Sequence, residues 1–380
     1  MRIHHVVPHF HPEKGGVESN VLGLARYLAG RGHAVVVHTS RRTIRGGRLP
    51  DQDVVDGIQI RRYRPSLRLG YYATLFSPVI DDPDLVHLHG YGFLTNDRVV
   101  RIVRGSVPTV YSLHHGVAQP PPTATARAKR LIYDRAFGLR TLGRVEAIVP
   151  ASAADRLWLE ARRLPRDRVH VLPTGLDPDA FRPGSPERVK NRFHLGTYLM
   201  FLGRLHREKS PDHLLRAVAS LGSAWSGQVV FVGPDGGERS SLERLTQSLG
   251  LGDRVAFPGE VDEPTKRDLL SGALCLVLPS FYEAQGIVIA EAWAQGRPVI
   301  ASRVGGVPYL VEDGRDGLLY PYSDIAALAE CLRRIAANPS LASEMGRAGR
   351  DKARTSLTWE VIAPRFEELY GSLVRGTPRD

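Results

Sequence analysis

Cysteine is scarce in this chain of 380 residues, which contains only two. Cys275 lies in an apolar run and Cys331 on the apolar side of an expected helix, so both are predicted to be small core residues. Two such positions provide neither a disulfide framework nor a metal-binding set. Cysteine usage of this kind indicates a reducing compartment.

Long apolar runs are missing as well. No segment approaches the roughly 18 uninterrupted apolar residues that are needed to cross a bilayer. Residues 1–8 have the pattern of a first strand rather than that of a signal peptide. We therefore expect a cytoplasmic protein, one that could also work at the inner face of the cell membrane.

Several common catalytic motifs are absent. The chain has no G-x-G-x-x-G after a strand, no Walker lysine, no H-E-x-x-H and no G-x-S-x-G. These absences argue against the common dehydrogenases, NTPases, zinc peptidases and serine hydrolases.

Metal binding is also disfavoured. His4, His5, His9 and His11 lie close together in the sequence but lack carboxylates at ligand spacing. The segment Asp177-Pro178-Asp179 matches a D-x-D metal pattern, yet its proline-rich surroundings favour a turn. We expect no metal and no cofactor.

The length of the chain and a segment rich in Pro, Gly and Asp predict two domains. A chain of 380 residues with 42% hydrophobic residues is too long for one ordinary core. Residues 173–186 are dense in Pro, Gly and Asp, which is typical of a linker. Strands are expected near residues 2–7, 34–39, 85–89, 107–113 and 146–150, alternating with helices, and the same plan restarts at Tyr198. The pattern predicts an α/β fold and ends in an amphipathic helix within residues 357–380.

Positive charge is concentrated in the first half. Residues 1–180 carry 26 Lys and Arg against 16 Asp and Glu, whereas residues 181–380 carry 25 against 24. The cations cluster at residues 41–45, 61–68 and 127–144. Such clusters attract anionic lipid, acidic glycans or nucleic acid. Peripheral contact with an anionic membrane and an ordinary solvated basic face are both open at this point.

Two carboxylates flank a strand-to-helix turn around residue 285. An apolar run, residues 274–278, predicts a buried strand, after which Glu283 lies in a loop and Glu291 in the following helix. Ligands of parallel sheets bind beyond the carboxyl ends of the strands, where helix N-termini present amide groups. Amides near Gly286 and Ile287 could thus hold a phosphate or a sugar oxygen. A capping carboxylate and a water-facing helix glutamate are the plain alternatives.

A basic loop follows an earlier strand. Arg204 and Lys209 come between the apolar run 198–202 and a helix expected to start at Ser210, its N-cap. A guanidinium and an ammonium together suit a diphosphate, whose negative charge grows when a glycosidic bond to it breaks. Two solvated surface cations are the alternative.

These motifs together carry a resemblance. The stretch from Gly203 to Leu319 resembles the donor-binding half of the group 1 retaining glycosyltransferases, glycosyltransferase family 4, and weaker similarity covers nearly the whole chain. The matching features are Gly203-Arg204 with Lys209, the E-x7-E pair Glu283 and Glu291, and the segment 296–302 followed by Gly305-Gly306.

The resemblance implies the GT-B fold, in which two Rossmann-like doubly wound domains face each other across a cleft. Residues 1–180 would form the acceptor-binding domain and residues 187–356 the nucleotide-sugar-binding domain. Residues 357–380 would form a helix that packs back on the N-terminal domain.

The resemblance also implies roles for single residues. Arg204 and Lys209 would bind the donor diphosphate, Glu283 would lie beside the transferred sugar, and Glu291 would bind the ribose. With the donor held in this way, we expect its base to lie near the loop of residues 258–261, which ends at Val261.

In the N-terminal half, the resemblance places Gly15 and Gly16 beside the donor phosphate and the acceptor. It places His114 near the transferred sugar, with His115 as an alternative. Taken by themselves, a flexible turn and a structural strand-end histidine would be the plainer interpretations.

The implied activity is retaining, metal-independent transfer of a hexose from a GDP- or UDP-sugar to a hydroxyl of a lipid-linked or glycan acceptor. Cell-envelope glycolipid or polysaccharide synthesis would be its setting, and nucleic acid is not an expected partner. A sugar-nucleotide 2-epimerase of the same fold and a non-catalytic basic module that binds membrane or nucleic acid remain alternatives. The chain departs from the family at Tyr309, where a glutamate is usual, and at Thr174, where asparagine is frequent.

Overall fold

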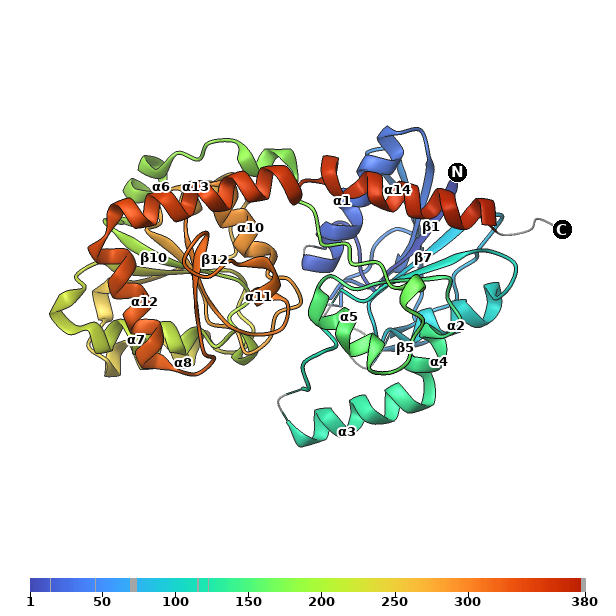
Figure 1. Cartoon of the computed structure of the whole chain (residues 1–380). Coiled ribbons are helices and arrows are strands. Elements are labelled where there is room, and N and C mark those ends of the chain that lie inside the picture. Colours follow the sequence, from blue (N-terminus) through green and yellow to red (C-terminus); the bar gives the residue numbers. More distant parts are fainter. Residues whose placement is uncertain (14, 45, 69–73, 115, 122, 377–380) are drawn as a thin grey trace. The chain divides into compact units, whose positions relative to one another are not determined.

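The computed structural model describes residues 1–13, 15–44, 46–68, 74–114, 116–121 and 123–376 (Figure 1). The chain divides into two compact units. The first contains Met1–Gly175 together with Trp359–Asp380, and the second contains Leu176–Thr358. Each unit is built on a mainly parallel sheet with helices around it, which confirms the predicted α/β class.

The sheet of the first unit has seven strands. Its order across the sheet is β3 (Gln52–Val55), β4 (Ile58–Tyr63), β2 (Ala34–Ser40), β1 (Arg2–Val6), β7 (Leu85–His89), β8 (Thr109–Ser112) and β9 (Ala147–Val149). All neighbouring pairs are parallel except β3 with β4. A separate ladder joins β5 (Leu67–Arg68) to β6 (Thr74–Leu75).

Two strands of this sheet, β3 and β4, were not predicted. In β4 the apolar side chains of Ile58 and Ile60 are buried, while Gln59 between them is exposed. This alternation is typical of a strand with one solvated face. The alternating pattern is short and continues directly into Arg61 and Arg62. Because these charged residues belong to a basic cluster, the strand could not be recognised in the sequence.

Helices cover both faces of the first sheet. They are α1 (Gly16–Gly30), α2 (Leu94–Val103), α3 (Ala124–Tyr133), α4 (Leu139–Leu142), α5 (Ala153–Glu160) and α14 (Trp359–Gly376), with a π-helical turn, Asp134–Gly138, between α3 and α4.

The last helix, α14, packs beside α1 in the core of the first unit (Figure 1). A Cβ atom at Gly23 would lie 2.0 Å from Nε1 of Trp359, so this position of α1 accepts no side chain. Further along α14, the hydroxyl of Tyr370 lies 2.6 Å from Nδ1 of His87 in β7. The first unit is thus assembled from the two ends of the sequence.

The second unit has a fully parallel sheet of six strands. Their order is β12 (Val255–Gly259), β11 (Gln228–Val232), β10 (Tyr198–Leu202), β13 (Cys275–Leu278), β14 (Val299–Ser302) and β15 (Gly317–Tyr320). The helices around it are α6 (Pro186–Phe193), α7 (Pro211–Leu221), α8 (Arg239–Ser248), α9 (Glu263–Gly272), α10 (Ile287–Ala294), α11 (Val307–Leu310), α12 (Ile325–Ala337) and α13 (Pro339–Ser356).

The strand order of the second sheet reverses between β10 and β13. From β10 the chain continues outward to β11 and β12, and from β13 it continues the other way to β14 and β15. Loops that leave the carboxyl ends of such neighbouring strands diverge, and ligands of open α/β sheets bind there. The loop with Arg204 follows β10 and the loop with Glu283 follows β13.

The segment around Asp177 forms a turn. Asp177 precedes a short 3-10 helix, Pro178–Phe181, and its carboxylate accepts a hydrogen bond from the amide of Asp179 at 2.9 Å. Asp179 in turn forms an ion pair with Arg182 at 3.0 Å. Both carboxylates of the D-x-D pattern therefore have local partners.

Within the described part of the chain, no helix combines the length and the apolar character needed to span a membrane.

Candidate active site

The two loops at the switch point of the second sheet are joined to each other. Strands β10 and β13 pair in parallel, with Leu199 opposite Cys275. Beyond the strand ends, the amide of Phe281 donates a hydrogen bond to the carbonyl of Glu208 at 2.9 Å. The loops after β10 and β13 thus lie against each other.

Lys209 and Glu283 meet across this junction. Nζ of Lys209 lies 2.6 Å from Oε1 of Glu283, and the hydroxyl of Ser280 donates to the same oxygen at 2.8 Å. Glu283 is buried, and these two donors replace the hydrogen bonds to water that its carboxylate has lost. The lysine ammonium has three donor hydrogens, so it can hold Glu283 and an anionic ligand together.

The glycine pair 305–306 supports the loop of Glu283. The amide of Gly306 donates to the carbonyl of Glu283 at 3.0 Å. Gly305 has a φ of 50°, and a Cβ atom there would lie 2.0 Å from the same carbonyl oxygen. The sequence showed these glycines only as part of a motif. In the structure they allow the chain to approach the backbone of Glu283 closely.

Gly286 and Ile287 form the start of α10. Gly286 has a φ of 77°, which favours glycine, and a Cβ atom there would lie 3.0 Å from Cδ1 of Ile289. Gly286 provides no side-chain cap, and the first amides of a helix have no acceptor within it. The amide groups expected to hold a phosphate or a sugar oxygen therefore follow directly on the loop of Glu283.

Glu291 has a partner that the sequence did not indicate. Nζ of Lys266, on α9, lies 2.7 Å from Oε1 of Glu291 and 2.8 Å from Oε2 of Glu263. Burial alone would lower the pKa of Lys266, but the two carboxylates outweigh it, so the pKa is raised and the lysine stays charged. Glu291 is thus part of an ion pair. Lys266 was missed because it lies on a polar helix that pairs with α10 only in three dimensions.

Val261 lies between β12 and α9. Its side chain is partly buried and packs against the core of the second unit. Asp262, the next residue, caps α9 by accepting from the amide of Thr265 at 2.9 Å. The loop predicted to lie near a base is therefore tied to the start of a helix.

Arg204 and Tyr309 are more exposed. The side chain of Arg204 is 56% exposed, and its Nη2 lies 4.0 Å from Oε2 of Glu208. Tyr309, in α11, is 57% exposed and replaces the glutamate that the family resemblance led us to expect. An exposed guanidinium can turn toward an anion at little cost.

The predicted capping role of Ser210 is wrong. Ser210 occupies the N-cap position of α7, but its φ of 45° turns the hydroxyl away from the helix amides. The hydroxyl instead donates to the carbonyl of Arg207 at 3.2 Å and lies 3.1 Å from the hydroxyl of Tyr322. Ser210 therefore holds the loop of Lys209 rather than the helix.

Gly15 and Gly16 lie at the start of α1 in the first unit. Gly15 is extended, and a Cβ atom there would lie 2.4 Å from a carboxylate oxygen of the buried Glu18. At Gly16 a Cβ atom would meet nothing within 4 Å. Gly15 thus makes room for Glu18, whereas Gly16 leaves open space at the first turn of the helix.

His114 follows β8 and is linked to other histidines. It has a φ of 62°, and its Nε2 lies 2.7 Å from Nδ1 of His89. Nε2 of His89 lies 2.8 Å from Nδ1 of His5. Burial lowers the pKa of His5 to about 3 and holds the pKa of His89 well below its usual value, so both rings are neutral. His115, the alternative to His114, lies outside the described residues.

The same histidines could be considered as metal ligands. Nitrogen atoms of His5, His87 and His89 lie within 4.8 Å of one another. The sequence had instead grouped histidines that are close along the chain. However, His87 already contacts Tyr370 at 2.6 Å and Ser112 at 2.8 Å. The 2.8 Å between His5 and His89 is also shorter than the separation of about 3.3 Å that tetrahedral zinc bonds impose on two nitrogens. The geometry favours hydrogen bonds.

Both halves of the chain match known protein families. Residues 187–352 match the family described as Glycosyl transferases group 1, and residues 14–180 match Glycosyltransferase Family 4. Among curated proteins, the chain is 31% identical over 375 residues to D-inositol 3-phosphate glycosyltransferase of Acidothermus cellulolyticus, covering 88% of this chain and 81% of the relative.

Solved structures show the same fold. Sucrose-phosphate synthase from Thermosynechococcus elongatus is 25% identical, with a TM-score of 0.83 over 98% of this chain and 99% of that chain. HepE of Anabaena, in complex with UDP-glucose, is 18% identical, with a TM-score of 0.76 over 98% and 100% of the two chains. The GT-B fold implied by the sequence is confirmed.

Proposed function

Because the chain belongs to the group 1 glycosyltransferases of glycosyltransferase family 4, we propose that it transfers a hexose from a GDP- or UDP-sugar to an acceptor hydroxyl, with retention and without a metal ion. The observation that most directly supports this activity is the contact between Lys209 and Glu283 at the switch point of the second sheet. It brings a cation suited to a diphosphate next to a carboxylate suited to a sugar hydroxyl.

In the proposed reaction, negative charge develops on the departing phosphate, beside Lys209 and Arg204. The bond between the sugar and the diphosphate breaks, and the acceptor oxygen bonds to the same carbon from the same face. The acceptor proton passes to the departing phosphate. Lys209 and Arg204 stabilise the charge that develops on this phosphate, which is the electrostatic task that a metal ion performs in other transferases.

The two glutamates hold the donor at either end in this proposal. Glu283 accepts hydrogen bonds from hydroxyl groups of the hexose and does not itself form a covalent bond to it. Glu291 accepts from the ribose hydroxyls, while its ion pair with Lys266 holds the carboxylate in place. The amides of Gly286 and Ile287 and the side of Val261 complete the nucleotide site. In the first unit, His114 is proposed to contact the sugar, and Gly15 and Gly16 are proposed to contact the phosphate.

A phosphorylated polyol is the acceptor class that we favour. Curated relatives of at least 30% identity over most of their length are named D-inositol 3-phosphate glycosyltransferase. The sequence alone led us to expect a lipid-linked or glycan acceptor in cell-envelope synthesis. These two acceptor classes require different assays, so they can be separated experimentally.

One observation keeps a membrane-bound acceptor as the second candidate. Helix α3 has no buried residue, and Leu131 and Ile132 at its end are 53% and 66% exposed. The helix also carries Arg127, Lys129 and Arg130. An exposed helix with apolar and basic side chains is typical of contact with an anionic lipid surface.

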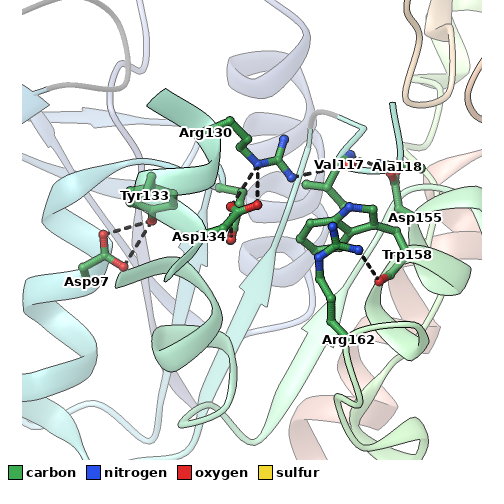
Figure 2. Close-up of polar contacts among 10 residues, drawn as sticks. Asp97, Val117, Ala118, Arg130, Tyr133, Asp134, Asp155, Trp158 and Arg162 are labelled. Atoms are coloured by element: carbon green, nitrogen blue, oxygen red, sulfur yellow. Dashed lines mark hydrogen bonds and ion pairs between the residues drawn. The ribbon is translucent and has the colours of Figure 1, made fainter. Parts of the chain in front are cut away.

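Helix α3 is held to the body of the first unit by polar contacts, which Figure 2 shows, and by a contact with an aromatic ring. Arg130 lies over the ring of Trp158, at 5.1 Å from its centroid, and donates a hydrogen bond to the carbonyl of Val117 at 3.3 Å. The hydroxyl of Tyr133 donates to a carboxylate oxygen of Asp97 at 2.9 Å. These contacts fix the helix while its apolar end stays in solvent.

The test of the proposed function has two steps. A thermal-shift screen of GDP- and UDP-hexoses comes first, since a ligand at 100 times its Kd stabilises the fold by about 2.7 kcal/mol. The best donor is then incubated with D-inositol 3-phosphate or with anionic vesicles that contain a glycolipid. A glycosylated product from either acceptor supports glycosyl transfer and identifies the acceptor class. Release of an epimerised sugar without acceptor would favour the epimerase, and no turnover with any donor would refute the enzyme.

A further inference from the structure

Three neighbouring elements of the first sheet contribute histidines to one hydrogen-bonded chain. His5 comes from β1, His89 from the end of β7, and His114 from the segment after β8. The register places His5 opposite His87 and His89 opposite Ser112, so these side chains share one face of the sheet. The resulting chain runs from His5 through His89 to His114, with nitrogen separations of 2.8 and 2.7 Å.

His5, at the buried end of this row of histidines, determines which ring nitrogens carry the hydrogens. His5 is completely buried, and its Nε2 has no hydrogen-bond partner among the described residues. A neutral imidazole carries one N–H, and an unpaired buried N–H is rarer in proteins than an unpaired acceptor. The hydrogen of His5 therefore lies on Nδ1, and Nε2 keeps a lone pair. The low pKa of His5, which burial causes, agrees with a neutral ring.

This choice fixes the other two rings in turn. Nδ1–H of His5 donates to Nε2 of His89, which must then carry its own hydrogen on Nδ1. That hydrogen is donated to Nε2 of His114. We propose that His5 and His89 are positioning residues that hold His114 in the tautomer with its hydrogen on Nδ1.

The backbone conformation of His114 indicates that its surroundings fix the position of this side chain. Its φ of 62° is in the left-handed region, a strained conformation that a residue with a side chain keeps only when its surroundings impose it. With Nε2 accepting from His89, the His114 ring carries its hydrogen on Nδ1, an atom that can then only donate. A donor at this atom suits an oxygen of the hexose. This consequence for transfer rests on the proposed function, whereas the tautomer itself does not.

A second pair on the opposite face of the same strand provides a matched control. Nδ1 of His4 lies 3.1 Å from Nε2 of His38, and Nδ1 of His38 lies 2.9 Å from the hydroxyl of Tyr63. His4 is as completely buried as His5 and is its neighbour in β1. His4 has no place in the chain that ends at His114.

The test measures the tautomers directly. Two-bond ¹H–¹⁵N spectra of the whole protein with ¹⁵N-labelled histidine distinguish Nδ1–H from Nε2–H rings, and a His114→Gln variant identifies the signals of His114. We expect hydrogen on Nδ1 of His114 in the wild-type protein. Hydrogen on Nε2 of His114, or a stoichiometric metal ion bound to the histidines in the purified protein, would overturn the proposal.

Two leucine variants then test the role of the chain. In His5→Leu nothing fixes the direction of the hydrogen bond between His89 and His114, so we expect mixed tautomers at His114. We also expect a kcat at least about 10-fold lower at an unchanged donor KM. His4→Leu should lower the Tm by a similar amount but leave His114 and kcat unchanged. An unchanged His114 spectrum in His5→Leu would refute the positioning role. If the wild-type protein transfers no sugar, the proposed function fails, while the His114 spectrum still decides this inference.

Discussion

Lys209 and Glu283 are 74 positions apart in the sequence, yet their side chains form an ion pair of 2.6 Å. They meet because β10 and β13 are neighbours in the sheet, so the loops that follow these strands leave the same edge. The pair therefore depends on the topology of the second unit.

Removal of the Lys209 ammonium should abolish most transfer. Lys209→Ala takes away a cation aimed at the departing phosphate, and the loss of one such group typically lowers kcat about 100- to 1,000-fold. Steady-state kinetics with the best donor measure this effect. Arg216→Ala, which breaks only an exposed pair with Asp212 on α7, is the control and should change kcat and Tm little. Near-wild-type turnover in Lys209→Ala would remove this residue from the proposed role.

Gly305 should tolerate no side chain. In Gly305→Ala the new Cβ atom would lie 2.0 Å from the carbonyl oxygen of Glu283, so the loop must move and both stability and kcat should fall. Gly314→Ala is a matched control, because Gly314 also has a positive φ, of 84°, but a Cβ atom there meets nothing within 4 Å. The control should lose only the left-handed strain energy, about 1–2 kcal/mol, and keep its activity. Urea unfolding and kinetics compare the two variants, and equal losses would contradict the proposed contact.

A similar pair tests the docking of α14. Gly23→Ala should destabilise the protein, since its Cβ atom would lie 2.0 Å from Nε1 of Trp359. In the same helix, Gly30→Ala meets nothing within 4 Å and should be neutral or slightly stabilising. The difference in Tm between the two variants measures how closely α1 and α14 pack. If both variants unfold at the same temperature, α14 does not lie against Gly23.

Acid should weaken the first unit through its buried histidines. Burial lowers the pKa of His4 to about 4 and those of His5 and His38 to about 3, whereas the unfolded value is 6.5. Below pH 6.5 the unfolded chain binds protons that the folded protein does not, so the free energy of unfolding falls as the pH falls toward 4. Each histidine contributes about 1.4 kcal/mol per pH unit in this range.

Urea unfolding at pH 7, 6 and 5 measures this slope. A His38→Leu variant should be less stable at pH 7 but lose less stability on acidification, because one of the titrating groups has been removed. A slope that stays the same in this variant would show that His38 is not buried as a neutral ring.

Helix α3 should bind anionic vesicles if the second acceptor class is correct. The double variant Leu131→Asp with Ile132→Asp replaces two exposed apolar side chains, whose burial in lipid would contribute about 1.5–3 kcal/mol each. Vesicle binding should fall more than 10-fold, and binding of the wild-type protein should weaken with salt. Val54→Asp changes an equally exposed residue on β3 and should have no effect. Salt-independent binding, or no binding by the wild-type protein, would exclude a lipid surface as the site of the acceptor.

The sequence predicted those parts of the molecule that depend on local patterns. The strand before Glu283 and the helix that starts after Gly286 follow from an apolar run and a glycine turn, and the structure has both. Strand β4 was missed because its alternation is short and merges with Arg61 and Arg62. A local pattern predicts an element when its hydrophobic period is long enough to stand out from its neighbours.

Contacts between distant elements could not be predicted in the same way. Lys266 pairs with Glu291 only because α9 lies beside α10, and nothing in the sequence around Lys266 indicates it. His5, His89 and His114 become one chain because β1, β7 and β8 are adjacent in the sheet, an order that the sequence does not reveal. For Ser210 the sequence predicted an interaction that the structure lacks. Serine is a common helix cap, but the backbone conformation of Ser210 prevents this role.

The packing of α14 on α1 has a consequence for the order of events at the ribosome. Residues 1–175 emerge before α14, but their core remains open until Trp359, Phe366 and Tyr370 have been synthesised. The second unit, from Leu176 to Thr358, is continuous and complete before then. Helix α14 is therefore needed to complete a core whose other elements are translated well before it, and nascent chains that stop short of α14 will present an uncovered apolar surface to chaperones.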